Sequence, residues 1–318
     1  MSGTHEAVLA IDVGGTSMKG AVVARDGRPL HVDRRPTDPG GDTIAAIVGY
    51  LRDLSAVAAA AGATVVGAGV VTPGMIDEED GTVVYASNLD WRDVPLRALL
   101  TRAAGFPVVT GHDVRTAGLA EQLFGAARGV SDFLLVTIGT GVAAALVTAG
   151  RPVVGAGGAA GEFGHIPMVP GGEACTCGQR GCLEVYASGA GLTRRYAART
   201  GVQLPAEAVV ARLGDDDAAD AVWSDAVAVL AQGLATATLL MDPTTFVLGG
   251  GFTAAGDALF DPLRARLAEG LVWRPAPPVR VAQLGSEAGW IGAAALAFRS
   301  AGLGDAVRGW QPLAFSAG

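Results

Sequence analysis

The chain has 318 residues, of which 50% are hydrophobic and 17% are charged, which is typical of a globular protein with one large or two ordinary domains. Its net charge of −8 would repel a phosphodiester backbone, so we expect no nucleic-acid partner. The N-terminal segment has no basic region before its apolar run, and the longest apolar stretch, 56–71, is too weak and interrupted to span a bilayer. We therefore expect a cytoplasmic protein with no signal peptide and no membrane contact.

The first third of the chain alternates strand-like and turn-like segments. Two apolar runs are joined so closely by Gly14-Gly15-Thr16 that they predict a β-hairpin rather than a strand–helix unit. A short apolar segment later leads into Gly111-His112-Asp113. The predicted elements are strands at 8–13 and 20–24, a helix at 43–61, and strands at 65–71 and 107–109.

A second cycle of the same kind follows a helix expected over 114–125. Strands at 133–138 and 142–148 enclose Gly139-Thr140-Gly141, which repeats the strand–turn–strand pattern and indicates two related halves. The mixture predicts an α/β fold with a domain boundary near 110–115. The remaining predicted elements are a helix at 218–240, a strand at 245–248, and helices at 254–269 and 290–298.

The first glycine-rich turn, Asp12 to Thr16, is a candidate phosphate site. Backbone N–H groups of Gly14 and Gly15 can approach an anion closely, and Thr16 adds a hydroxyl donor. Asp12 is a candidate for holding Mg²⁺ through water. The turn lacks the Gly-Lys-Ser/Thr ending of a Walker A loop, and a strand follows it, which also excludes a dinucleotide fingerprint. An ordinary hairpin turn is the alternative.

Two further turns extend this hypothesis. Thr140 and Gly141 lie in a matching turn on the second half, as expected if a phosphate chain takes donors from two walls. Gly249, Gly250 and Gly251 follow a strand and precede a helix. Three bare residues suit a purine and ribose lying against the backbone, although a tight strand–helix corner is an equally good explanation.

Asp113 follows a short buried strand at the expected boundary. A carboxylate there is a candidate general base that takes a proton from an alcohol attacking a phosphoryl group. The spacing by itself favours a different role, the N-cap of the helix that begins at Val114.

The segment 161–184 contains all three cysteines of the chain. His165, Cys175, Cys177 and Cys182 form the complete ligand set of a closed, structural Zn²⁺ site, whereas buried free cysteines would not explain the spacing. Glu162 and Glu184 bracket these ligands. Carboxylates on a rigid loop suit sugar hydroxyls, because they only accept hydrogen bonds; solvated loop charges are the alternative.

Together these motifs resemble the ROK (repressor, open reading frame, kinase) family, and most closely its zinc-containing, ATP-dependent actinobacterial glucokinases. The resemblance covers 8–298, and its most specific part is G-E-x-G-H followed by C-x-C-G-x-x-G-C-L-E at 161–184. It implies an actin/hexokinase-like (ribonuclease H-like) two-domain α/β fold with a cleft between the domains. The expected domains are a small one, 1–112, joined by the C-terminal helix at about 290–318, and a large one, 113–289, which carries the zinc loop.

The resemblance also assigns roles by position. Asp113 matches the catalytic base, and His165 would both ligate zinc and touch the sugar. The hexose-binding set is Asn88, His112, Asp113, Glu162, His165 and Glu184, and the ATP-binding set is Asp12, Gly14, Gly15, Thr16, Thr140, Gly141, Gly249, Gly250 and Gly251.

Two departures from the family pattern stand out. Glu-Asn-Asp-Ala-Asn is common around the base, but 111–115 here is Gly-His-Asp-Val-Arg, so His112 replaces an asparagine that contacts sugar hydroxyls. This leaves the choice of hexose open. The second turn continues with Val142-Ala143-Ala144 in place of a glycine run, which should change close packing but not phosphate contacts.

The implied reaction is transfer of the γ-phosphoryl group of ATP, with Mg²⁺, to the 6-hydroxyl of a hexose, glucose first. N-acetylglucosamine, N-acetylmannosamine or fructose as acceptor, and polyphosphate as donor, are alternatives. A sugar-responsive repressor or a non-catalytic sensor is a remote one, because only seven residues precede the first predicted strand and Asp113 is present. The resemblance further implies a homodimer or homotetramer.

Overall fold

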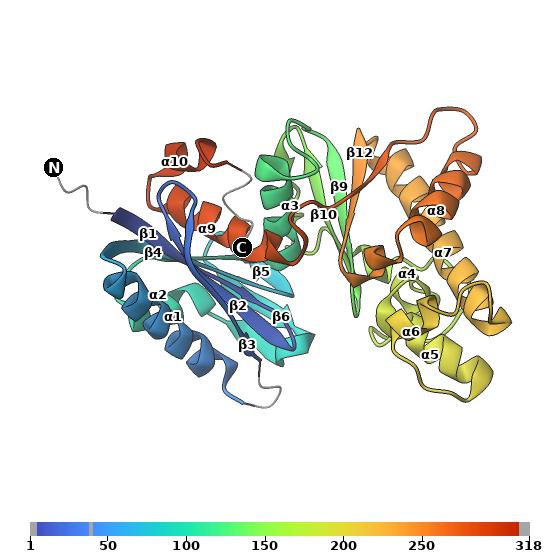
Figure 1. The fold of residues 1–318 in the computed structure, drawn as a ribbon, viewed down its shortest axis with the longest axis horizontal. Coiled ribbons are helices and arrows are strands. Elements are labelled where there is room, and N and C mark those ends of the chain that lie inside the picture. The colour runs from blue at the N-terminus through green and yellow to red at the C-terminus, as the bar shows by residue number, and fades with distance from the viewer. Residues whose placement is uncertain (1–4, 38–40, 312–318) are drawn as a thin grey trace. The chain divides into compact units, whose positions relative to one another are not determined.

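The computed structural model describes residues 5–37 and 41–311 (Figure 1). By internal contacts the chain forms two compact units. The first comprises the chain up to Arg128, Val154–Ala159 and the chain from Ser286 onward; the second comprises Gly129–Val153 and Ala160–Gly285. The first unit thus extends past residue 112, because helix α3 (Asp113–Phe124) packs on helix α9 (Ala288–Ser300).

The first unit is built on a five-stranded sheet. β1 (His5–Val13) lies at its centre, antiparallel to β2 (Ser17–Ala24) and parallel to β4 (Ala63–Thr72). β3 (Pro29–Pro36) pairs with β2, and β8 (Val108–His112) with β4, giving the order β3-β2-β1-β4-β8. Residues 7–11 of β1 are fully buried, which requires cover on both faces of the sheet.

Helices provide that cover. α1 (Thr43–Ala60) packs on β2 and β4, and α9 packs on β1 and β4 from the other side of the sheet (Figure 1). α1 begins where the Asp42 carboxylate accepts a hydrogen bond from Ala45 N at 3.0 Å. The remaining elements are α2 (Leu96–Ala104), α10 (Gly304–Arg308), and a small sheet of β5 (Met75–Asp77), β6 (Thr82–Ala86) and β7 (Trp91–Val94), with a 3₁₀ turn at Ser87–Leu89.

The second unit repeats the strand plan of the first. Its sheet has the order β11-β10-β9-β12-β13, with β9 (Phe133–Ile138) antiparallel to β10 (Val142–Thr148) and parallel to β12 (Thr245–Gly249). The outer strands are β11 (Arg151–Pro152) and β13 (Val279–Val281). Strand order and direction match the first sheet position by position, so the expectation of two related halves is confirmed.

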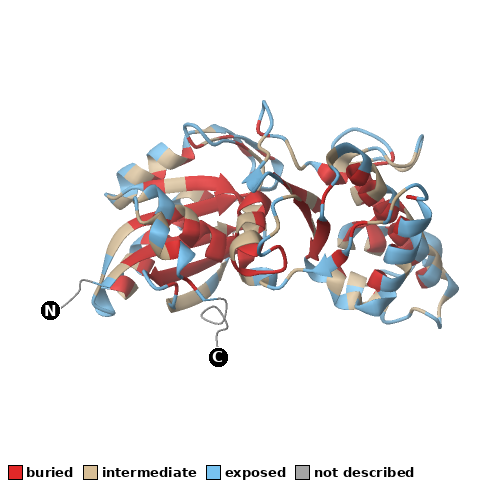
Figure 2. Cartoon of the chain, turned by 90° about the horizontal axis from the view of Figure 1, so that it is seen from above, coloured by how far each residue is buried: buried red, intermediate tan, exposed pale blue. Residues whose placement is uncertain are grey.

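Helix α7 (Asp217–Met241) forms the core of the second unit. Its buried residues share one cluster with Leu134, Val136 and Ile138, the alternate residues of β9. Figure 2 shows that the buried residues of the chain gather on the strands of the sheets and on parts of the helices. The other helices are α4 (Leu183–Tyr186), α5 (Gly189–Thr200), α6 (Ala206–Val210) and α8 (Asp257–Glu269), with 3₁₀ turns at Phe163–His165, Gly251–Ala255 and Gly285–Glu287.

Within the described residues, two helices, α1 and α7, have the length and apolar composition of a membrane span. Both instead supply core residues to their own unit: Ile47, Tyr50 and Leu54 of α1, and Val222, Leu230 and Leu234 of α7, are fully buried. Their apolar composition is therefore explained by packing against the two sheets.

Candidate functional site

The first glycine turn lies at the end of the β1–β2 hairpin. Gly14 N donates to Ser17 O at 2.9 Å, which closes the turn. A side chain at Gly15 would lie 3.5 Å from the Asn88 Cβ, so the 3₁₀ turn carrying Asn88 is adjacent to the turn. The structure thus places Asn88 beside the first candidate phosphate turn, although 72 positions separate Asn88 from Thr16 in the chain.

Asp12, at the end of β1, has an unusual electrostatic environment. Burial, followed by the negative charge of Asp113, raises its pKa from 3.8 to about 7. Lys19 is paired opposite Asp12 in the β1–β2 register and opposes this shift. The Lys19 Nζ lies 2.9 Å from Glu287 Oε1. Two interacting carboxylates beside a glycine turn form a place where a divalent cation would be stabilised.

The helix that starts at Asp113 is capped by a different residue. His112 is the N-cap of α3, and its Nδ1 accepts hydrogen bonds from Val114 N at 3.2 Å and Arg115 N at 3.3 Å. The competing interpretation, that Asp113 is itself the N-cap, is therefore wrong. Nδ1 also lies 3.2 Å from Asp113 Oδ1, but a nitrogen that accepts from two backbone N–H groups carries no proton to donate.

Arg115 fixes the first turn of α3. It is buried, its Nε lies 2.9 Å from Glu78 Oε1, and its Nη1 donates to Gly158 O at 3.0 Å. These contacts hold the helix that carries Asp113 against the β5–β6 turn. The arginine that departs from the family pattern therefore has a structural role near the candidate base.

The second glycine turn closes the β9–β10 hairpin in the second unit. The Glu184 Oε2 accepts a hydrogen bond from Val142 N at 2.8 Å. On the other side of the turn, Gly189 N donates to Gly139 O at 2.8 Å. Residues that follow the cysteine cluster therefore hold both sides of this turn, a relationship that sequence spacing did not indicate.

A cavity of about 540 Å³ lies beside the same turn. Gly139, Thr140, Gly251 and Phe252 contribute to its wall, so the second and third glycine turns meet at one cavity. Its polar side chains among the described residues are those of Thr140, Thr193 and Glu207, and its other lining residues are small or apolar. Such a wall suits a flat heterocycle with a few hydrogen-bonding groups.

The three glycines at 249–251 differ in what they do. Gly250 has φ +87° and a side chain there would collide with the Ile138 backbone, so this position requires glycine for the strand–helix corner. Gly251 is open on its Cα side and lines the cavity. The strand–helix corner thus explains Gly250, and contact with a purine and ribose stays a prediction for Gly251.

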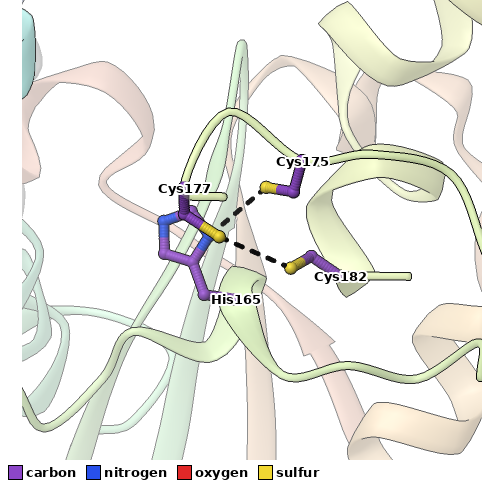
Figure 3. A group of neighbouring side chains, drawn as sticks. All are labelled: His165, Cys175, Cys177 and Cys182. Carbon is purple, nitrogen blue, oxygen red and sulfur yellow. Dashed lines mark hydrogen bonds between the residues drawn. The ribbon is translucent and has the colours of Figure 1, made fainter. Parts of the chain in front are cut away.

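His165, Cys175, Cys177 and Cys182 converge in the second unit (Figure 3). Their ligand atoms all lie within 4.8 Å of one another; the Cys177 and Cys182 sulfurs are 3.7 Å apart, and Cys175 Sγ is 3.8 Å from His165 Nδ1. Sulfur ligands 2.3 Å from a tetrahedral Zn²⁺ would be separated by about 3.8 Å. The donor set and its spacing therefore fit zinc.

The imidazole of His165 faces in two directions. Its Nδ1 points into the cysteine cluster, whereas its Nε2 lies 3.9 Å from Glu162 Oε2. Glu162 is exposed, and Glu184 is half-buried. One histidine can thus ligate a metal with Nδ1 while Nε2 remains directed toward a carboxylate.

Comparisons with known proteins identify the family of this chain. The ROK family model matches residues 8–300. This chain belongs to the ROK family. A glucokinase of Streptomyces coelicolor is 35% identical over 91% of this chain and 96% of its own length. Among solved structures, a ROK hexokinase from Thermus thermophilus matches with a TM-score of 0.81 and 32% identity, over 92% of this chain and 98% of that one.

A third similar protein was solved with ligands. The ROK family glucokinase from Streptomyces griseus, in complex with glucose and AMPPNP, has a TM-score of 0.79 and 34% identity, and the match covers 92% of this chain and 99% of that chain. The actin/hexokinase-like fold expected from the sequence is confirmed. The ROK match includes every candidate residue named above, from Asp12 to Gly251.

Proposed function

We propose that this protein is an ATP-dependent hexokinase-type phosphotransferase that phosphorylates the 6-hydroxyl of a hexose, with glucose as the first substrate. The observation that carries this assignment is the electrostatic interaction of Asp113, the first residue after β8, with Asp12 beside a glycine turn; burial and then the Asp113 charge raise the pKa of Asp12. The similar glucokinases agree with it.

Asp113 acts as the general base in this proposal. It accepts the proton of the 6-hydroxyl while that oxygen forms a bond to the γ-phosphorus and the bond to the β,γ-bridging oxygen breaks, releasing ADP. His112 is the N-cap of α3, and Asp113 contributes one further hydrogen bond there, from Val114 N to its Oδ1 at 2.6 Å. Asp12 would hold Mg²⁺ through water, and that ion supplies charge neutralisation on the phosphates when bound.

Substrate contacts are divided among the residues already described. Gly14, Gly15, Thr16, Thr140 and Gly141 would bind phosphates, and the cavity lined by Gly251 and Phe252 would take the adenosine. The hexose would be held by Asn88, His112, Glu162, His165 and Glu184. Acceptor carboxylates suit hydroxyl donors, which supports the roles of Glu162 and Glu184.

Zinc is the proposed structural ion of the second unit. His165, Cys175, Cys177 and Cys182 would hold it, and four protein ligands leave no open position for a reacting water. The ion would rigidify the loop that carries Glu162 and Glu184. Zinc removal should therefore lower hexose affinity through disorder of this loop.

A coupled assay of ADP formation tests the proposal. Glucose, fructose, N-acetylglucosamine and N-acetylmannosamine are compared as acceptors, with ATP and polyphosphate as donors. Glucose with ATP should give the highest kcat/KM. Asp113→Asn should lower kcat by on the order of 10³-fold while leaving hexose binding largely intact. Normal turnover by this variant would refute the assigned base.

We also infer a cytoplasmic homo-oligomer, dimer or tetramer. Leu240, Val272 and Trp273 are 80%, 89% and 69% exposed. Val272 and Trp273 directly precede Arg274, which forms an ion pair with Asp242, two residues after Leu240. An apolar patch of this kind suits contact with the same patch of a second copy. Light scattering of Leu240→Asp should show a smaller species than the wild type, and an unchanged mass would reject this interface.

A further inference from the structure

We infer that Glu184 is a positioning residue for the nucleotide as well as a hexose ligand, because its carboxylate holds the second phosphate turn in place. The inference rests on the proposed function and deepens it. Glu184 Oε2 accepts the backbone hydrogen of Val142, the first residue after the turn, at 2.8 Å. A charged acceptor makes this a stronger hydrogen bond than a neutral one would.

Two glycines make room for this carboxylate. A side chain at Gly141 would lie 2.5 Å from Glu184 Oε2, and one at Gly164 would lie 3.2 Å from Glu184 Cβ. Gly141 does not have a positive φ, so backbone conformation does not require glycine there. The close approach of the Glu184 carboxylate explains why this position has no side chain.

The short segment from Glu184 to Gly189 holds the turn at both ends. Gly189 N donates to Gly139 O, opposite the Glu184 contact with Val142. The segment begins two residues after Cys182, a member of the cysteine–histidine cluster. Order in that cluster is thereby transmitted through a few residues to the backbone that would bind phosphate.

One carboxylate would then serve two substrates. Oε2 is engaged by the Val142 N–H, and Oε1 has no hydrogen-bond partner among the described residues, which leaves it for a hexose hydroxyl. Displacing Glu184 should therefore weaken nucleotide and hexose binding together. Glu162, a second proposed hexose ligand in this loop, forms no hydrogen bond with the turn among the described residues and should affect only the hexose.

Calorimetric titration of MgADP in the absence of hexose tests this directly. Glu184→Ala should raise the Kd for MgADP about tenfold, the loss expected for a charged hydrogen bond. Glu184→Gln keeps an acceptor oxygen for Val142 N–H and should remain near the wild-type value. Glu162→Ala, the matched control, should bind MgADP as the wild type does.

Gly141→Ala disturbs the contact between Glu184 and Val142 without changing either residue, because the added methyl group would displace the Glu184 carboxylate. It should raise the Kd for MgADP and also the Kd for glucose, although Gly141 is not a proposed hexose ligand. Combined with Glu184→Ala, it should add little for MgADP, because both changes remove one interaction. The melting temperature and the metal content of each variant show whether it is folded. Gly141→Ala and Glu184→Ala therefore test the same contact independently.

The outcomes separate the two hypotheses. If the wild type binds MgADP and phosphorylates glucose but a folded Glu184→Ala protein binds MgADP normally, the positioning role is wrong and the proposed function stands. If Glu162→Ala weakens MgADP binding as much as Glu184→Ala, the effect is general loop disorder and the positioning role is again wrong. If the wild type neither binds MgADP nor phosphorylates a hexose, both hypotheses fail.

Discussion

The Asp12 carboxylate occupies the space that a side chain at Gly289 would fill. Gly289 lies in the first turn of α9, which packs on β1, the strand that ends in Asp12. Helix N-termini favour nearby negative charge, so this position lowers the cost of holding a buried carboxylate. The last long helix of the chain therefore helps to place an acidic residue from its first strand.

Gly289→Ala should displace Asp12 and lower activity. A methyl group at this position would collide with the carboxylate, so the side chain that is proposed to hold Mg²⁺ must rotate away. We expect kcat/KM for MgATP to fall about tenfold or more, which corresponds to roughly 1.4 kcal/mol of transition-state stabilisation. Steady-state kinetics at saturating glucose measure this.

Gly49→Ala is the matched control for that substitution. Gly49 lies inside α1, and a methyl group there meets nothing within 4 Å. Removing a helical glycine should stabilise the protein by about 0.5–1 kcal/mol without altering kinetics. If Gly289→Ala behaves like Gly49→Ala, the contact with Asp12 has no functional importance.

The raised pKa of Asp12 predicts a pH-dependent stability in the absence of nucleotide and divalent ions. The folded protein binds this proton more tightly than the unfolded chain, because the pKa is about 7 in the fold and 3.8 ordinarily. The stabilisation is complete below about pH 4 and is lost as pH rises through about 7, by at most about 4 kcal/mol. Asp12→Asn should lack this loss.

Urea unfolding at about pH 5 and about pH 8 measures the difference. Asp12→Asn should gain stability relative to the wild type as pH rises, since an amide cannot ionise. Equal pH dependence of the two proteins would show that the Asp12 carboxyl titrates normally.

The sequence predicted the elements that have strong periodicity. Strands 133–138 and 142–148 agree with β9 and β10, and the helix at 218–240 differs from α7 by one residue at each end. The helix expected from Ala254 begins at Asp257, because Gly251–Ala255 form a 3₁₀ turn. The small sheet around Tyr85 was missed, since its strands of three to five residues are too short for a clear pattern.

Site residues were predictable where chemistry and spacing coincide. The cysteine–histidine cluster converges as its spacing suggested. In contrast, the Glu184 contact with Val142 joins residues 42 positions apart, and the Asp12 contact with Gly289 joins opposite ends of the chain. Such contacts depend on tertiary packing, for which a single sequence carries no local signal. The position of Lys19, the only lysine of the sequence, near Asp12 likewise results from tertiary packing, and its charge lowers the pKa of Asp12.

His112, the N-cap of α3, stands where the family commonly has asparagine, and substitutions there test its contribution to stability and to the choice of hexose. His112→Ala should lower the free energy of unfolding by about 1 kcal/mol, because Arg115 N–H loses its side-chain acceptor and Val114 N–H keeps only Asp113 Oδ1. His112→Asn should restore most of it, since asparagine is a good N-cap. Denaturant unfolding measures stability, and the hexose panel repeated on His112→Asn shows whether this position also sets the acceptor.

Zinc occupancy can be measured without reference to activity. The purified protein should contain about one Zn²⁺ per chain, and Cys182→Ala should lose it, because Cys182 is the buried sulfur of the cluster. Metal analysis and limited proteolysis within 161–184 are the measurements. A metal-free wild type with a protease-resistant loop would contradict a structural ion.

Filling the cavity beside the second turn should separate nucleotide from hexose binding. Ala190 lines this cavity and is exposed, so Ala190→Trp would place an indole where the adenosine is proposed to lie. We expect the KM for MgATP to rise at least tenfold, with glucose affinity unchanged in the absence of nucleotide. Ala198→Trp, an exposed change on the same helix and outside the cavity lining, controls for the added indole. Equal KM values for the two variants would mean that the adenosine binds elsewhere.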